Sequence, residues 1–443
     1  MRLLVVSVLV VVLGGACAHA ASFGASETVG AGPTLATAAV AGGAGTFAFV
    51  ARQQAGIVGA VRRGLGSAWK TRTLATGPAY SVRDPQIVMD VDGTVTALWT
   101  AELPHPALVA ARAPAGAGFG AAHVVARLND AAGARPRMLA LPSRRVLVVF
   151  DDRSFLRPGL LSAHPHLKTI AIENGHASAV RDLGVEGAYP AIAPAGGGAI
   201  LVYIAGAARC RRSVCAPRAV RATLLDGAGR RAGTTVTVAH DGGTYFYPPR
   251  VTSAGSQAVL SWVRPGHGSA SPTRPFTREY STRPLRAVGG ARPFPIFGGP
   301  GVGTPSVAIL RDGDLLGANV GNAAPGEPFG GKAELSLAPG GGAWQAPTPL
   351  SSPSAWTTVP RVAALSGGRA LAVFARSRSE PGPAVYDVIA VERSATGALT
   401  QTTLGSSLTT NDAGGLSSSV AGDDQAIVTW PRTGGGVDVV LRP

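Results

Sequence analysis

Three arginines occupy the same position of a recurring pattern, and this arrangement favours binding of an anionic group. Arg137, Arg250 and Arg361 each directly follow a proline that recurs at intervals of about 51 to 59 residues. Guanidinium groups held at one level can bind a carboxylate or phosphate through paired hydrogen bonds. The alternative is structural: each arginine could instead pair with an acidic residue of a neighbouring loop.

Aromatic and polar side chains cluster in the segments that we expect to form loops beside these arginines. Tyr245 and Tyr247 lie in the stretch 239–248, Trp356 lies in another, and Asp151 and Asp152 lie in a third. Exposed aromatic rings next to polar groups suit contact with a sugar or a peptide. The same rings could equally pack the loops against the protein.

An enzyme acting on glycosidic bonds would need two carboxyl groups within about 10 Å of each other near the arginines. The acidic residues that could supply them are Glu186, Asp241, Asp84 and Asp130. Because the sequence does not bring any two of them together, it assigns no catalytic residue.

Other signatures of chemistry are incomplete. Asp90-Val-Asp92-Gly93 resembles part of a calcium loop but lacks the remaining ligands, so it predicts a hairpin turn. His105, His164 and His166 have no partner ligands nearby in the sequence. A nucleophile elbow and a phosphate-binding loop are both missing from the sequence. We therefore predict no metal site and no cofactor.

The elements that position these residues follow from the repeat. After each recurrent proline comes a short apolar stretch, a Gly or Asp turn, and then a second apolar run rich in β-branched and aromatic residues. Such runs are too short for helices and are typical of buried strands. The prolines are Pro33, Pro85, Pro136, Pro190, Pro249, Pro305 and Pro360, and an eighth copy begins near Leu416 without one. The second runs are 46–50, 94–99, 146–150, 199–203, 258–262, 315–319, 370–374 and 426–430.

Most repeats have room for two further strands. Examples of the third are 57–61, 107–111, 219–225, 332–337 and 384–391, and examples of the fourth are 69–74, 119–125, 234–238, 344–350 and 399–404. Four strands in about 50 residues make one blade of a β-propeller. The fold class expected is therefore all-β, a single propeller of about eight four-stranded blades.

The ends of the chain predict how the ring closes. The last copy has only three strands, and residues 22–29 resemble a fourth strand, so the N-terminal strand would complete the last blade. Seven blades plus an irregular segment is the alternative, because the third and fifth repeats are poorly patterned. In a propeller the arginines would start innermost strands near the channel mouth. The equivalent residues in the other repeats would be Thr34, Gln86, Ala191, Ser306 and Ser418.

The first 20 residues have the features of a secretory signal peptide. Arg2 precedes an apolar stretch and Ala18-His19-Ala20 offers a cleavage site, which leaves residues 21–443 as the propeller domain. Lipid anchoring at Cys17 is the alternative to release. No later apolar run is long enough to span a membrane. The protein is therefore expected to be secreted or associated with the cell envelope.

Cysteine usage agrees with export, and the charge bears on possible partners. Cys210 and Cys215 are spaced for a local disulfide in an oxidising compartment. With 40 Lys and Arg against 25 Asp and Glu, the formal charge is +15. A basic surface favours anionic partners, but the preferred explanation is compositional, because GC-rich codons encode Ala, Gly, Arg and Pro. The charge is spread along the chain without a nucleic-acid-binding module, so no nucleic acid is expected as a partner.

The pattern resembles exported bacterial propellers of the sialidase-like type. The resemblance covers nearly the whole mature chain and rests on degenerate Asp-box turns, in which Gly66 and Trp69, or Gly341 and Trp344, keep the Gly and the aromatic. The third such turn ends in Phe119. In that family the Asp-box is structural, and here its Asp position holds Gly or Pro.

The resemblance and the residues together lead to one functional hypothesis with two alternatives. We expect a monomeric, non-catalytic propeller that binds a glycan, a cell-envelope polymer or a protein through its loop-rich face. The first alternative is a sialidase-like glycosidase or lyase acting on an acidic sugar. The second is a structural scaffold without a small ligand.

Overall fold

The computed structural model describes residues 22–443 apart from 78–81, 103–104, 130–133, 153–154, 158–159, 162–164, 206–218, 241–246, 265–273, 296–302, 323–330, 353–356, 378–385 and 409–414. The predicted signal peptide and Cys17 lie outside these residues. So do Cys210 and Cys215, and their disulfide stays a prediction.

Antiparallel β-strands make up nearly all the regular structure of the described residues, which contain no α-helix. The few helical turns are of the 3-10 type: η1 (Gly43–Gly45), η3 (Pro339–Gly341) and η4 (Ser366–Gly368). Tight turns join the first two strands of each repeat. Gly93 and Gly313 lie in two of them with φ of 83° and 86°, a conformation that glycine adopts without strain. The Asp-Gly pairs therefore form turns, as the sequence predicted.

The first two repeats each form one four-stranded sheet whose strands are neighbours in chain order. The first sheet contains β2 (Thr34–Gly42), β3 (Thr46–Gln53), β4 (Gly56–Arg63) and β5 (Lys70–Thr76). The second contains β6 (Val82–Met89), β7 (Val95–Ala101), β8 (Ala107–Ala113) and β9 (His123–Arg127).

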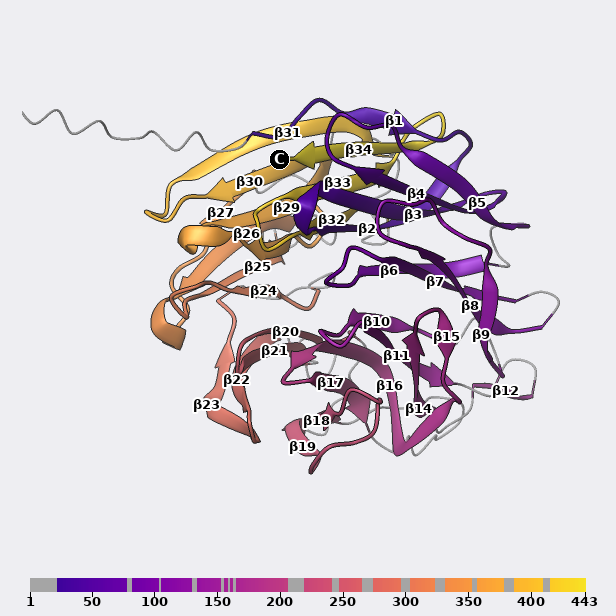
Figure 1. Ribbon diagram of the computed structural model, residues 1–443. Coiled ribbons are helices and arrows are strands. Elements are labelled where there is room, and N and C mark those ends of the chain that lie inside the picture. The colour runs from indigo at the N-terminus through magenta and orange to yellow at the C-terminus, as the bar shows by residue number, and fades with distance from the viewer. Residues whose placement is uncertain are drawn as a thin grey trace, which may run out of the picture.

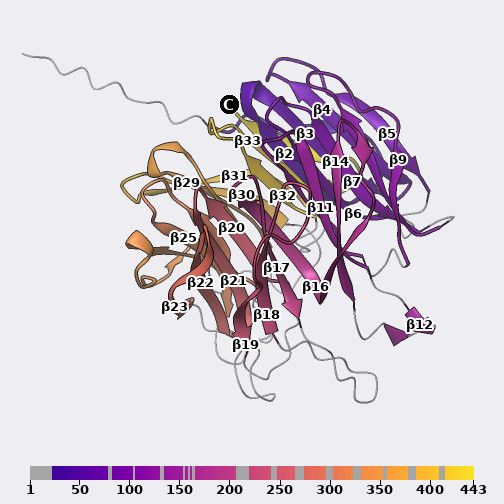
Figure 2. The ribbon, with the colours of Figure 1, turned by 60° about the horizontal axis from the view of Figure 1, so that its bottom comes forward.

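The third and fourth repeats share one long strand, β16 (Arg181–Ala195), which pairs with β14 and then with β17 (Figure 2). The third sheet also contains β10 (Arg137–Ala140), β11 (Arg145–Asp152), β14 (His166–Glu173) and the short β15 (His176–Ala177). A separate hairpin joins β12 (Phe155–Arg157) to β13 (Leu160–Leu161). The fourth sheet adds β17 (Gly198–Ala205), β18 (Ala219–Leu225) and β19 (Val236–His240). The poorly patterned third repeat thus still has its strands.

The fifth, sixth and seventh repeats return to single four-stranded sheets. The fifth consists of β20 (Arg250–Ala254), β21 (Gln257–Arg264), β22 (Arg274–Thr282) and β23 (Leu285–Pro293). The sixth consists of β24 (Ser306–Ile309), β25 (Leu315–Asn322), β26 (Gly331–Ala338) and β27 (Thr348–Pro349). The seventh consists of β28 (Arg361–Ala364), β29 (Ala370–Ser377), β30 (Tyr386–Arg393) and β31 (Leu399–Leu408).

The two ends of the chain meet in the eighth sheet. Strands β32 (Ser417–Val420), β33 (Ala426–Pro431) and β34 (Val437–Arg442) are followed by the N-terminal strand β1 (Glu27–Val29). In the register of this pairing, Glu27 faces Val439 and Val29 faces Val437. The pairing predicted for the N-terminal strand is present, over a shorter stretch than residues 22–29.

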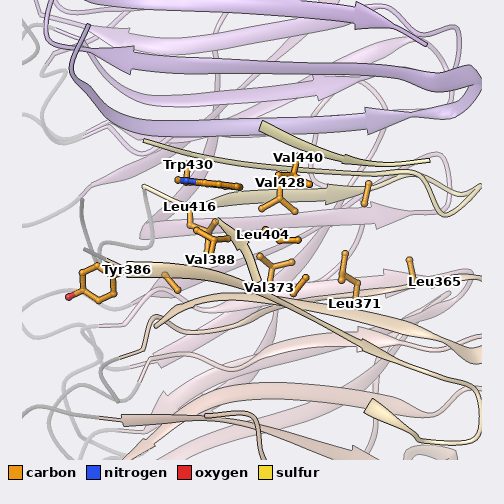
Figure 3. Close-up of a cluster of buried hydrophobic side chains, with 13 residues drawn as sticks. Leu365, Leu371, Val373, Tyr386, Val388, Leu404, Leu416, Val428, Trp430 and Val440 are labelled. Carbon is orange, nitrogen blue, oxygen red and sulfur yellow. The ribbon is translucent and has the colours of Figure 1, made fainter. Parts of the chain in front are cut away.

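Apolar clusters fill the spaces between successive sheets. Trp430 and Val428 of the eighth sheet pack on Val373 and Val388 of the seventh, and all four are fully buried or nearly so (Figure 3). A comparable cluster joins the eighth sheet to the first through Ile427 and Phe49. Burying such side chains is the main stabilising contribution, about 1.5–3 kcal/mol for each large one.

The sheets follow one another in chain order about a common centre (Figure 1). The innermost strand β2 of the first sheet contacts β6 of the second and also β32 of the eighth. Four-stranded antiparallel sheets that pack face to face in this way are the architecture of a β-propeller.

The aromatic residues of the degenerate Asp-box turns pack at the boundary with the preceding sheet. Trp69 meets Phe49 of its own sheet edge-on, with 5.3 Å between ring centroids, and its Nε1 donates to Glu27 of the eighth sheet. Trp344 meets Phe294, directly after the fifth sheet, at 4.8 Å. Phe119 is buried against the first sheet. The part of the motif that this chain keeps therefore serves packing.

Candidate anion-binding site

The three arginines singled out by the repeat begin three innermost strands. Arg137 is the first residue of β10, Arg250 of β20 and Arg361 of β28. Their partners on the second strands are Val149, Ser261 and Val373, and each partner is the next-to-last residue of its apolar run. The arginines therefore occupy equivalent positions, as the spacing predicted.

Two of the residues that the sequence predicted at the arginine position of other repeats, Thr34 and Ser418, do not occupy it. In the first sheet the next-to-last residue of the run, Phe49, pairs with Ala39, whereas Thr34 pairs with Gln53. In the eighth sheet Thr429 pairs with Ser417, one residue before the predicted Ser418. The first error arises because Pro33 lies six residues before Ala39, whereas the other prolines directly precede this level, so Pro33 is not equivalent to them. The second arises because the eighth repeat has no proline to fix the register.

The positive charges of the three arginines act on one another. Burial, followed by the charges of Arg361 and Arg137, lowers the pKa of Arg250 to about 10. Burial and the charge of Arg137 also lower the pKa of Arg361. All three residues keep part of their surface exposed. The fold thus concentrates positive charge at this level.

Acidic residues compensate the charge of Arg137 in part. Burial lowers its pKa, while the carboxylates of Asp84 and Asp151 act in the opposite direction. Its Nη1 donates to the carbonyl oxygen of Pro136 at 2.9 Å. Arg137 therefore has acidic neighbours that offset part of its charge, as the structural alternative predicted.

The expectation that Asp151 and Asp152 lie in an exposed loop is wrong. Both end strand β11 and are buried. Asp151 accepts a hydrogen bond from the backbone N–H of Arg135 at 2.8 Å, and Asp152 accepts one from Lys168 Nζ at 2.5 Å. Both carboxylates therefore have a structural role, since a buried charge is stable only when it is paired.

Arg250 has a different environment. It forms no hydrogen bond or ion pair with any residue in the part of the chain that the structure describes. It lines a cavity of about 210 Å³ that opens between the fifth, sixth and seventh sheets. The other lining residues are Val251, Thr252, Val259, Ser261, Ser306, Val307 and Val362.

Two serines in this cavity differ in what they can offer a ligand. Ser306 Oγ accepts a hydrogen bond from the backbone N–H of Val362 at 3.1 Å, which leaves its own proton available for donation. Ser261 Oγ donates to the carbonyl oxygen of Pro305 at 2.8 Å, which leaves only lone pairs. The sequence placed Ser306 at the arginine level but gave no reason to expect it in a site. Its position at the same level as the three arginines was the only feature of the sequence that could have pointed to Ser306.

Of the three aromatic candidates, Tyr247 lies within the described residues. Tyr245 and Trp356 lie outside the described residues. Tyr247 is partly buried, three positions before Arg250. The segment between them is fixed by Thr304, whose hydroxyl donates to the carbonyl oxygen of Pro248 at 2.7 Å.

Of the four carboxyl candidates, two can be placed. Asp84 lies in β6 and acts on Arg137. Glu186 lies in β16, opposite His166 of the third sheet, close to where that strand crosses to the fourth. Asp130 and Asp241 lie outside the described residues. The described residues therefore place one of these carboxylates, Asp84, at the arginine level.

The described part of the chain contains neither a cluster of metal ligands nor a membrane-spanning helix. Within it, no three His, Cys, Asp or Glu residues gather as ligands for a metal ion. Asp90 and Asp92 flank the turn between β6 and β7, in which both carboxylates accept the N–H of Thr94. This is the hairpin that the sequence predicted. Among the same residues, no helix has the length and apolar character needed to cross a membrane.

Comparison with known proteins gives no family. No family model matches the chain, and no curated protein does. Three of the similar solved structures are a lectin, BP39L from Burkholderia pseudomallei, a Dyadobacter fermentans protein of unknown function and the Hadza microbial sialidase Hz136.

The likeness to these structures is weak. The lectin has a TM-score of 0.49 and 10% identity over 83% of this chain and 98% of its own. The Dyadobacter protein has a TM-score of 0.47 and 11% identity, over 94% of this chain and 99% of its own. The sialidase has a TM-score of 0.44 and 10% identity, over 88% of this chain and 74% of its own. At TM-scores below 0.5 these likenesses assign no function to the chain.

Proposed function

We propose that the chain is an exported propeller of eight four-stranded blades, in which the N-terminal strand closes the ring. The apolar cluster between the eighth and first sheets supports this closure. So do hydrogen bonds across the same boundary, from Thr37 Oγ1 to the carbonyl oxygen of Thr429 at 3.2 Å and from Ala39 N to Ser417 Oγ at 3.0 Å. The signal sequence and the cysteine spacing support secretion or retention at the cell envelope.

We further propose that this propeller binds an anionic glycan or envelope polymer at the arginine level without catalysing a reaction. The observation that carries the proposal is Arg250, a cation facing a cavity with no acidic partner among the described residues. A cation that burial and two like charges disfavour is costly to keep unless a ligand uses it. An acidic polymer entering at the channel mouth would supply the missing negative charge.

A glycosidase is the second candidate because Asp84 acts on Arg137 at the same level. The φ of Asp84 is 48°, which is uncommon for residues other than glycine, and such conformations are concentrated at functional sites. Hydrolysis would need a second carboxyl group within about 10 Å of it. Release of a fluorophore from acidic aryl glycosides, abolished in Asp84→Asn, would establish this candidate in place of simple binding.

The binding proposal is tested with immobilised polysaccharides. The mature protein, residues 21–443, is compared with a triple variant in which Arg137, Arg250 and Arg361 are changed to Gln. The matched control changes the exposed residues Arg181, Arg286 and Arg311 to Gln, so that both variants lose the same charge. We expect retention on acidic but not neutral polysaccharides, lost only in the first variant. Equal loss in both variants would mean that diffuse surface charge causes the binding and would overturn the proposal.

A further inference from the structure

The cavity beside Arg250 has the features of a site for one compact anionic group. Arg250 carries five N–H donors in a planar fork, and none is used by a described residue. Valines form much of the wall, at Val251, Val259, Val307 and Val362. A site of about 210 Å³ is smaller than most pockets for drug-sized ligands, so it would admit a single group and not a length of polymer.

A second donor points to the same kind of ligand. The hydroxyl of Ser306 keeps its proton because its oxygen already accepts the N–H of Val362. Arg250 and Ser306 begin adjacent innermost strands, β20 and β24, which contact each other. A guanidinium and a hydroxyl donor at one cavity form a set that binds the oxygens of an oxyanion.

The charge around Arg250 distinguishes between oxyanions. Arg361 and Arg137 are the charges that act on it, and both are positive. The carboxylates of Asp84 and Asp151 act on Arg137 instead. Since Coulomb energy is proportional to the charge of the ligand, a dianion gains about twice as much from this environment as a monoanion.

We propose that the cavity between β20, β24 and β28 binds a phosphate monoester group in preference to a carboxylate, with Arg250 and Ser306 as its donors. This inference rests on the proposed function, because it names the group by which an anionic glycan would be held. A phosphate monoester carries close to two negative charges at neutral pH and three acceptor oxygens. The ester oxygen would link the bound group to a sugar that extends toward the channel mouth.

The test uses three ligands with the same pyranose ring and different substituents at C6. These are glucose 6-phosphate, glucuronic acid and glucose, titrated calorimetrically into the mature protein at one fixed low salt concentration. We expect glucose 6-phosphate to bind about tenfold more tightly than glucuronic acid, and glucose to give no signal.

The variants assign the binding to the cavity. Arg250→Gln should weaken binding of glucose 6-phosphate about tenfold or more, because it removes both the charge and the paired donors. Arg286→Gln, on the outermost strand of the same sheet, removes the same charge at an exposed position and should change nothing. If Arg250→Gln fails to fold, Arg250→Lys tests the same point, since it keeps the charge but loses the planar fork.

Each other outcome overturns the inference. Equal or tighter binding of glucuronic acid would make the cavity a carboxylate site and leave the proposed function in place. Binding that survives Arg250→Gln would place the phosphate elsewhere. If none of the three ligands binds but acidic polysaccharides are still retained, the inference fails alone. If the polysaccharides are not retained either, the proposed function fails with it.

Discussion

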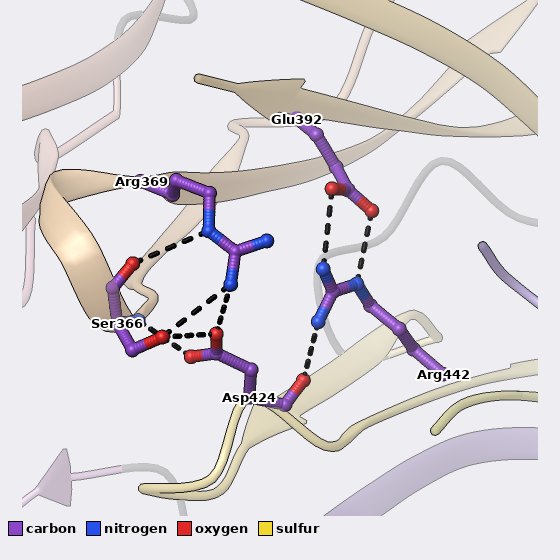
Figure 4. Close-up of polar contacts among 5 residues, drawn as sticks. All are labelled: Ser366, Arg369, Glu392, Asp424 and Arg442. Atoms are coloured by element: carbon purple, nitrogen blue, oxygen red, sulfur yellow. Dashed lines mark hydrogen bonds and ion pairs between the residues drawn. The ribbon is translucent and has the colours of Figure 1, made fainter. Parts of the chain in front are cut away.

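Arg442 holds the carboxylate of Glu392 through two parallel hydrogen bonds, Nε to Oε1 at 3.0 Å and Nη2 to Oε2 at 3.3 Å (Figure 4). The arginine is fully buried, and its Nη1 donates to the carbonyl oxygen of Asp424 at 2.6 Å. The Asp424 carboxylate in turn accepts hydrogen bonds from the backbone N–H and the hydroxyl of Ser366, both at 2.5 Å. These contacts join the last three strands of the chain to the seventh sheet.

Removing Arg442 should therefore destabilise the protein strongly. We expect Arg442→Ala to lower the free energy of unfolding by about 3–5 kcal/mol, because it leaves Glu392 without its buried partner. Urea unfolding followed by tryptophan fluorescence measures the change, and Arg181→Ala at an exposed position is the control. A loss below about 1 kcal/mol would show that solvent replaces the pair at little cost.

The N-terminal strand is expected to contribute to stability through Glu27. Its carboxylate accepts from Arg62 Nη1 at 2.7 and 2.8 Å and from Trp69 Nε1 at 3.3 Å. Glu27→Ala would leave the buried Arg62 unpaired, at a cost of about 1–3 kcal/mol. Thermal unfolding measures this cost, and Glu27→Gln should lose less because an amide oxygen still accepts.

Deleting residues 22–29 tests the role of the whole strand. Without β1, strand β34 becomes an exposed sheet edge, which invites pairing with other molecules. We expect a lower midpoint of thermal unfolding together with dimers or aggregates in size-exclusion chromatography. A monomer of unchanged stability would contradict the proposed closure of the ring by this strand.

Arg250 should behave in the opposite way to Arg442. In the absence of ligand, Arg250→Gln relieves repulsion by Arg361 and Arg137 and removes a buried cation. We expect it to stabilise the protein by about 0.5–2 kcal/mol, as is common when a functional residue is replaced. Differential scanning calorimetry in low salt checks this. A clear loss of stability would instead assign the arginine a structural partner and remove the observation that carries the proposed function.

Stability should depend on pH through the hairpin between β6 and β7. Burial and the hydrogen bond to Asp92 raise the pKa of Asp90 from 3.8 to about 6, and that hydrogen bond lowers the pKa of Asp92. The folded state thus binds a proton at Asp90 that the unfolded state has released, so this contribution is full below pH 3.8 and is lost as pH rises through about 6. The contribution of Asp92 is present above pH 3.8 and is lost below it.

The variant Asp90→Asn isolates the first of these effects. Its amide can donate to Asp92 at any pH, so it should remove the part of the stability loss between about pH 4 and 6 that comes from Asp90. Thermal midpoints of the variant and the unchanged protein across pH 4 to 8 provide the comparison. Parallel curves would show that Asp90 does not titrate in this range.

The accuracy of the strand predictions depends on burial. The second strands are buried on both faces, and the predicted runs 146–150 and 370–374 lie within β11 and β29. The fourth strands have one face in solvent and a weaker pattern. The predicted 344–350 contains only the two-residue β27, and 119–125 overlaps β9 by three residues. A strand exposed on one side carries about half of the apolar signal.

By itself, the sequence determined the all-β class, the repeat and the common level of Arg137, Arg250 and Arg361. These properties are periodic along the chain, and hydrophobic spacing records them directly. Only the tertiary structure decided which charges each arginine meets. Asp84 and Asp151 act on Arg137, whereas Arg250 meets two arginines more than a hundred residues away in the chain and a cavity that three sheets form together. Electrostatic interaction depends on distance in space, and sheets separated by a hundred residues become neighbours only when the chain has folded.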